Sequence, residues 1–140
     1  MSDSYYELID GGDGRGERFA ATDFVRSSWS AAIQHAAPVS ALLVRGLQRC
    51  EVRDDTRLSR VLIDLLGPVP AEGDLWVRAQ RQRSGRQIEL VSAEMLALGP
   101  DGEPRPVARA SGWRLQTIDT ASIVHAPAGP VAPGGRGGQA

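Results

Sequence analysis

Apolar residues recur at helical spacing between residues 38 and 50. The positions i, i+3, i+4, i+7, i+8 and i+11 are filled by Val39, Leu42, Leu43, Gly46, Leu47 and Cys50. This spacing predicts an amphipathic helix over Pro38–Arg49, and the proline suits its first turn, where no N–H is needed. Glycine inside a helix costs about 1 kcal/mol relative to alanine. We therefore expect Gly46 to mark close packing of the helix against a sheet.

The period changes to two after this helix. Val61, Ile63 and Leu65 share one face of a predicted strand, and Arg60, Leu62 and Asp64 share the other. Further strands are predicted over 75–83, 86–98 and 107–115, separated by turn residues at 84–85 and 99–102. In the first of these three strands, we expect Leu75, Val77 and Ala79 to pack on the helix.

Two short extended segments precede the helix, Tyr5–Leu8 and Glu17–Ala20, and we predict that they form a hairpin around the turn-rich residues 9–16. The glycine spacing at 12, 14 and 16 is superficially that of a phosphate-binding loop. Such loops lead directly into a helix, whereas here another strand follows. The acids Asp10, Asp13 and Glu17 do not match a calcium-loop pattern. A turn is the preferred interpretation, and the whole pattern predicts an α+β fold, an antiparallel sheet wrapped around one long central helix.

Composition and charge narrow the function classes. The chain has 140 residues, 41% of them apolar, and a formal net charge of −1. That size predicts a single domain, over residues 4–117, followed at 118–140 by an Ala/Gly/Pro-rich stretch that we expect to be a disordered linker or tail. Near neutrality argues against nucleic acid as a partner. No signal-like start and no run of about 18 apolar residues is present, so we expect a cytoplasmic protein without a membrane span.

Few residues suggest bound metals or redox groups. Cys50 is the only cysteine, which excludes an internal disulfide and a cysteine-based zinc site within one chain. We interpret Cys50 as buried and inert. No ligand pattern for a metal or a cofactor is visible, and we predict neither.

The order of these elements is that of the hotdog fold, and the chain resembles the N-terminal half of double-hotdog acyl-CoA thioesterases. The resemblance rests on the order and spacing of five segments, 24–29, 32–43, 57–70, 85–86 and 108–115. It implies a thioesterase that hydrolyses or binds fatty acyl-CoA where two hotdog domains meet, as a homodimer or with a second hotdog domain. The Pro- and Ala-rich residues 126–133 resemble the start of the linker between the two halves.

The resemblance also implies a site at the start of the helix, His35-Ala36-Ala37-Pro38, where backbone N–H groups can polarise a thioester carbonyl. The family usually carries two glycines where this chain has Ala36 and Ala37. His35 and Asp64 are the candidate catalytic groups, because a hydrolase needs a group that positions and deprotonates water. Candidate substrate-binding residues are Ala36, Ala37, Trp29, Ser59 and Arg60. For Trp29 and Trp113 a core position is preferred to an acyl tunnel.

Two alternatives remain open. The stretch 57–60, where related two-domain enzymes carry a carboxylate in their second half, contains no acid. With the two alanines, this favours a non-catalytic acyl-binding or structural subunit that pairs with a catalytic half. A hydratase or dehydratase of the same fold would need an acid beside His35. Asp23 is the nearest earlier acid along the chain, but no motif joins it to His35, so this alternative ranks last.

Overall fold

The structure, a computed structural model, describes residues 3–125 and 129. Six strands form one antiparallel sheet in the order β1-β2-β4-β5-β6-β3, and a single long helix lies against one face of it. Their bounds are β1 Tyr6–Asp13, β2 Gly16–Ala21, α1 Ala36–Arg49, β3 Thr56–Leu65, β4 Asp74–Arg83, β5 Ile88–Leu98 and β6 Pro104–Gln116. A short 3₁₀ helix spans Asp23–Val25. The predicted α+β architecture is confirmed.

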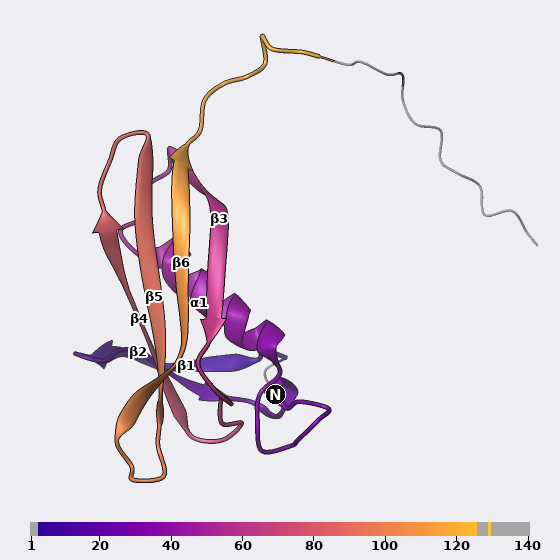
Figure 1. Cartoon of the computed structure of the whole chain (residues 1–140), viewed down its shortest axis with the longest axis vertical. Helices are drawn as coiled ribbons and strands as arrows, with labels where there is room; N and C mark the ends of the chain where they lie inside the picture. Colours follow the sequence, from indigo (N-terminus) through magenta and orange to yellow (C-terminus); the bar gives the residue numbers. More distant parts are fainter. Residues whose placement is uncertain (1–2, 126–128, 130–140) are drawn as a thin grey trace, which may run out of the picture.

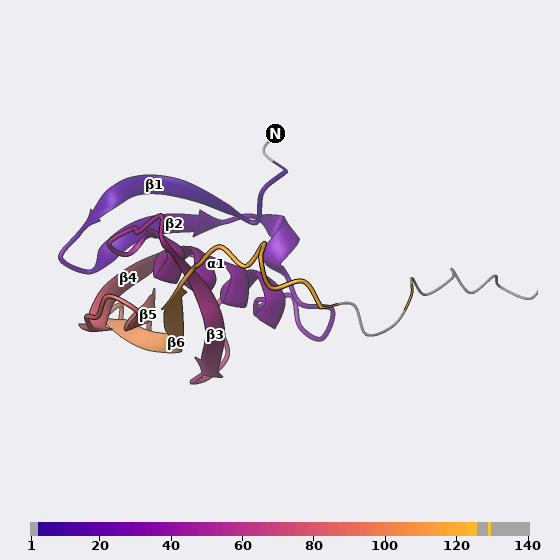
Figure 2. The same ribbon diagram turned by 90° about the horizontal axis from the view of Figure 1, so that it is seen from above.

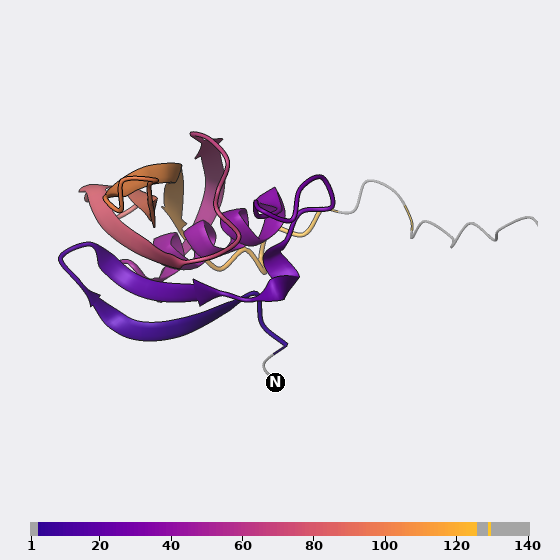
Figure 3. The same ribbon diagram turned by 90° about the horizontal axis from the view of Figure 1, so that it is seen from below.

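The sheet curls around α1 (Figure 1). Seen from above and from below, β1 and β2 lie on one side of the helix, and β5, β6 and β3 lie on the other (Figures 2 and 3). The core fills the space between helix and sheet. It comprises Phe19, Val39, Leu42, Leu43, Leu47, Val69, Leu75, Val77, Val91, Ala93, Met95, Ala97, Val107, Ala108 and Ala110.

Gly46 marks the close contact that the sequence predicted. A β-carbon added there would lie 2.9 Å from Val77 Cγ1 and 3.5 Å from Ala93 Cβ. The expected helix-facing side of β4 is confirmed too, because Leu75 and Val77 are buried and Ala79 packs against the core.

The first hairpin is longer than predicted. β1 continues to Asp13 and β2 starts at Gly16, so the turn itself is only Gly14 and Arg15. The register between these strands shifts twice, between Leu8 and Asp10 and between Asp10 and Asp13. Gly16 has a φ of 112°, and a β-carbon on it would lie 2.3 Å from the Val77 carbonyl oxygen. The glycines of this segment therefore serve the tight hairpin and its approach to β4.

Four expectations need correction. Trp29 is 90% exposed, so a core position is wrong for it. It lies in the loop before α1, where its backbone N–H donates to the Ser27 hydroxyl at 3.2 Å. Trp113 is half-buried, and Cys50 is only partly buried, although burial still raises the pKa of its thiol.

The helix begins at Ala36 rather than Pro38, because His35 caps it.

A buried ion pair closes the far end of α1. Arg114 donates to Glu89 Oε2 at 3.0 Å, and the two side chains are 4% and 1% exposed. The same guanidinium donates to the carbonyl oxygens of Leu47, Cys50 and Glu51, where the helix leaves its last carbonyls without intrahelical partners. The sequence does not predict this pair, since nothing in the spacing of apolar residues along β5 or β6 distinguishes it.

The described part of the chain contains no helix that combines the length and apolarity needed to cross a membrane. Most of the predicted tail, residues 126–128 and 130–140, lies outside the described residues.

Candidate functional site

The start of α1 is open to solvent. His35 is the N-cap residue, with φ −67° and ψ 144°, and its Nδ1 accepts a hydrogen bond from the Ala37 N–H at 3.1 Å. His35, Ala36 and Ala37 are all exposed, and no acidic residue lies in the first turn. The positive end of the helix dipole is thus presented to an incoming polar group rather than neutralised by the chain.

The cap determines which nitrogen of the neutral imidazole ring carries the proton. Because Nδ1 accepts a hydrogen bond, it carries no proton, and the proton of the neutral ring is on Nε2. The ring also covers the Ala37 N–H, and Pro38 has no N–H to offer. A carbonyl that takes its hydrogen bond from Ala37 must therefore displace the imidazole from that donor.

Gln34, the residue before the cap, anchors this end of the helix. Its side chain is buried, accepts from the Tyr6 hydroxyl at 2.6 Å and donates to the Pro70 carbonyl oxygen at 2.7 Å. Its backbone N–H donates to Val69 at 2.8 Å, and burial raises the pKa of Tyr6. These bonds tie the helix start to β1 and to the loop after β3. Sequence reasoning missed Gln34 and Tyr6, because a buried glutamine carries no periodic signal.

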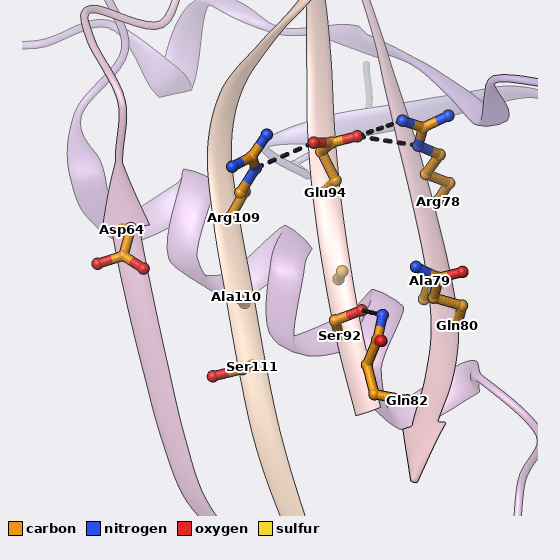
Figure 4. A pocket seen from close by; sticks show the side chains of 11 residues that line it. Asp64, Arg78, Ala79, Gln80, Gln82, Ser92, Glu94, Arg109, Ala110 and Ser111 are labelled. Atoms are coloured by element: carbon orange, nitrogen blue, oxygen red, sulfur yellow. Dashed lines mark hydrogen bonds and ion pairs between the residues drawn. The ribbon is translucent and has the colours of Figure 1, made fainter. Parts of the chain in front are cut away.

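Asp64 lies on the other face of the sheet, away from α1 (Figure 4). It lines a trough of about 610 Å³ on that outer face, bordered by residues of β3, β4, β5 and β6. One chain therefore does not bring Asp64 and His35 together. Their catalytic roles stay predictions.

Glu94 is the most sheltered acid of this trough. It accepts from Arg78 Nε at 2.9 Å and from Arg109 Nε at 3.0 Å. Burial acts to raise the pKa of Glu94, but the two guanidinium groups outweigh it and lower the pKa. The sequence analysis did not single out Glu94, because cross-strand register, which pairs it with both arginines, cannot be seen in one strand alone.

The remaining predicted binding residues are dispersed. Ser59 and Arg60 are exposed on β3 next to Leu58. Leu58 lies close to Leu47, a residue near the end of α1. Both side chains are within contact distance of the place that a β-carbon on Gly112 would occupy. Within one chain, Ser59 and Arg60 are therefore level with the end of the helix and not with its start. Trp29 lies on the loop that leads into His35.

Among the described residues, no three His, Cys, Asp or Glu side chains are grouped so as to hold a metal ion. The groups available at the helix start are backbone N–H donors, an imidazole and apolar alanines. That set can bind and polarise a carbonyl oxygen.

Solved structures share this fold. A thioesterase family protein from Silicibacter pomeroyi is 20% identical, with 82% of this chain and 86% of that chain covered at a TM-score of 0.57. A protein from Streptococcus mutans, solved bound to acetyl-CoA, is 14% identical, with 84% and 92% covered at 0.59. A hexameric broad-specificity acyl-coenzyme A thioesterase is 13% identical, with 74% and 78% covered at 0.57. At these identities the likeness establishes the hotdog fold.

A family model gives the closer assignment. No curated protein matches the chain. The model of the acyl-CoA thioesterase N-terminal domain matches residues 25–115, well over half of the chain, from the 3₁₀ helix to the last residues of β6. The match spans the helix start and the four strands around it, and the chain belongs to the acyl-CoA thioesterase N-terminal domain family.

Proposed function

We propose that this domain binds acyl-CoA with the thioester carbonyl at the N-terminus of α1, and hydrolyses the thioester when paired with a second hotdog domain. The observation that carries the proposal is the exposed helix start, free of acidic residues and held in place by Gln34. Oriented backbone N–H groups stabilise negative charge that develops on a carbonyl oxygen. Membership of the thioesterase family supports the choice of thioester over other carbonyl compounds.

His35 has two possible roles in this site. As a cap it orders the helix start, and a lost N-cap costs about 1 kcal/mol of stability. As a reacting group, the imidazole released from Ala37 becomes free to accept a proton from water at Nδ1. Asparagine is also a good N-cap residue, so the two roles can be separated by substitution.

Pairing is proposed to occur along the open edge of β3. Among the described residues β3 pairs only with β6, which leaves its other edge open, and its exposed side chains include Val61, Leu62 and Leu65. The opposite edge, β1, is broken by two register shifts, which disfavour continued strand pairing. Shortly after the end of β3, the carbonyl oxygen of Val69 accepts the hydrogen bond from the Gln34 backbone N–H. A partner at this edge would therefore stand beside the helix start.

The non-catalytic alternative is favoured by one specific observation. Asp64, the candidate acid, faces away from α1. If no group of a paired domain replaces it, the domain binds an acyl thioester without turnover and contributes structure to a catalytic partner.

Release of free thiol from a panel of acyl-CoA thioesters tests the proposal. Turnover that survives in Asp64→Ala, persists in His35→Asn at a reduced rate and is lost in His35→Ala would assign His35 mainly to the cap. Loss in both His35 variants, with folding intact, would assign a reacting role to the imidazole. Acyl-CoA binding without turnover would favour the non-catalytic subunit. Neither binding nor turnover by the folded protein would reject the proposal.

A further inference from the structure

Four charged residues are cross-strand neighbours on the outer face of the sheet and form a row across four strands. Arg78 on β4 is the cross-strand neighbour of Glu94 on β5, Glu94 of Arg109 on β6, and Arg109 of Asp64 on β3. The signs alternate from one end to the other, positive, negative, positive, negative. We call this set the charge row, and Figure 4 shows its four side chains on neighbouring strands.

The charge row is only partly satisfied within one chain. Glu94 is bound by both arginines and is 17% exposed, whereas Arg78 and Arg109 remain 54% and 56% exposed. Asp64 is exposed and takes part in no ion pair with another described residue. Strands are spaced by about 4.8 Å, so three steps put Asp64 about 14 Å from Arg78 of the same chain. These two end charges cannot neutralise each other inside one molecule.

A second copy of the chain can neutralise them. Consider two copies whose outer faces meet, related by a twofold axis that lies between the two faces. If this axis runs parallel to the strands and passes between Glu94 and Arg109, the partner's charge row has the reverse order. Arg78 then lies opposite the partner's Asp64, and Glu94 opposite the partner's Arg109. Every facing pair has opposite signs, as an isologous interface requires. An in-plane axis at right angles would instead place each residue opposite its own copy.

We propose that the outer face of this sheet is an interface that stacks against the same face of a second copy, with the two charge rows opposed in this way. The residues next to the charge row allow two sheets to approach closely. Gln80, Ser92 and Ser111 form the next cross-strand set, and the two serines at its centre are small. Sheets stack about 10 Å apart, a gap that arginine and glutamate side chains can span.

This contact is separate from edge pairing and does not depend on thioester binding. Edge pairing uses the backbone of β3, whereas stacking uses side chains of β3, β4, β5 and β6. Where both contacts form, the assembly is a tetramer. Where only stacking forms, it is a dimer.

Charge reversal at the two ends of the row tests the proposal through the mass in solution. Asp64→Lys places lysine opposite the partner's Arg78 at both ends of the interface, and Arg78→Glu places glutamate opposite the partner's Asp64. Each variant alone is expected to have half the mass of the wild type. Mixed in equal amounts, the two variants face each other with opposite charges at both ends, and the wild-type mass is expected to return.

Asp54→Lys is the matched control, because it makes the same charge change at an exposed position in the loop after α1. It should keep the wild-type mass. Unchanged mass in Asp64→Lys, or failure of two folded variants to reassociate on mixing, would overturn the proposal. If Arg78→Glu does not fold, the comparison of Asp64→Lys with Asp54→Lys decides alone. A wild type that is already monomeric at the highest workable concentration would also refute it, whatever its activity towards thioesters.

Discussion

The Arg114 guanidinium and the Glu89 carboxylate meet at 3.0 Å inside the fold, with only 4% and 1% of their side chains exposed. The pair stands at the end of α1, and Arg53 reaches the other carboxylate oxygen of Glu89 at 3.2 Å. Arg114 thus stabilises the last carbonyls of the helix while Glu89 balances its charge. The end of the helix opposite the candidate site is fixed by an ionic contact that is buried in the core.

Breaking this pair from one side is expected to destabilise the domain strongly. Arg114→Met leaves Glu89 buried with only Arg53 and removes the donors to the carbonyl oxygens of Leu47, Cys50 and Glu51. Loss of one partner of a buried pair costs about 3–5 kcal/mol. Urea unfolding measures the loss. The double variant Arg114→Met with Glu89→Leu should be less destabilised than the sum of the two single variants. Additive single effects would show that the two side chains act independently.

Gly46→Ala is expected to destabilise the domain even though alanine is the better helix former. The new β-carbon would stand 2.9 Å from Val77 Cγ1, on a buried β-branched side chain that has little room to move. Overpacking of this kind costs about 1–3 kcal/mol. In thermal unfolding, the double variant Gly46→Ala with Val77→Ala should be less destabilised than the sum of the two single variants. A more stable Gly46→Ala protein would contradict the close contact between α1 and β4.

Acid should weaken the outer face through Glu94. The pKa of Glu94 lies below its ordinary value of 4.5, because its two arginine partners outweigh burial. The contribution of the carboxylate to folding is therefore complete above that ordinary value and is lost as the pH falls through the lowered pKa. Glu94→Gln lacks this titration. The stability advantage of the wild type over Glu94→Gln, measured at a fixed protein concentration, should be constant above the ordinary value of 4.5 and should shrink as the pH falls below it. An advantage that does not change with pH would refute the assignment.

Leu65→Lys tests pairing along the edge of β3. Leu65 is 49% exposed, so a lysine there should be tolerated by the isolated fold. Charged side chains on an edge strand oppose strand-to-strand association. Sedimentation should show the mass halved relative to the wild type, with unchanged circular dichroism. The exposed Ile118→Lys, outside the sheet, is the control and should leave the mass unchanged. Identical masses for wild type and Leu65→Lys would place the partner elsewhere.

Periodic residues made the fold predictable. The helix face from Val39 to Leu47 and the helix-facing side of β4 were predicted correctly from the sequence. In β3 the expected face is only weakly buried, because Ile63 packs against the core while Val61 and Leu65 are 37% and 49% exposed. The expectation for Trp29 failed because a large apolar side chain in a loop has no period to place it.

The candidate site was predictable only in part. The helix itself was predicted, with its start two residues too late, but the distances between His35, Asp64 and Arg60 depend on how strands lie across the sheet. Cross-strand neighbours such as Glu94 and Arg109 come from segments whose relative register is set by the fold as a whole. Face alternation predicted that Asp64 points away from Ile63. It could not predict that Arg109 and Glu94 stand beside it.

Amide NMR of the helix start tests the central claim most directly, because it detects binding whether or not turnover follows. A non-hydrolysable acyl-CoA analogue that keeps the carbonyl group would be titrated into the labelled protein, with free CoA as the control. We expect the analogue to shift the amide signals of Ala36, Ala37 and Val39, and CoA alone to leave them near their free positions. Saturating binding that leaves these three amides unmoved, or equal shifts with CoA alone, would contradict a thioester site at the N-terminus of α1.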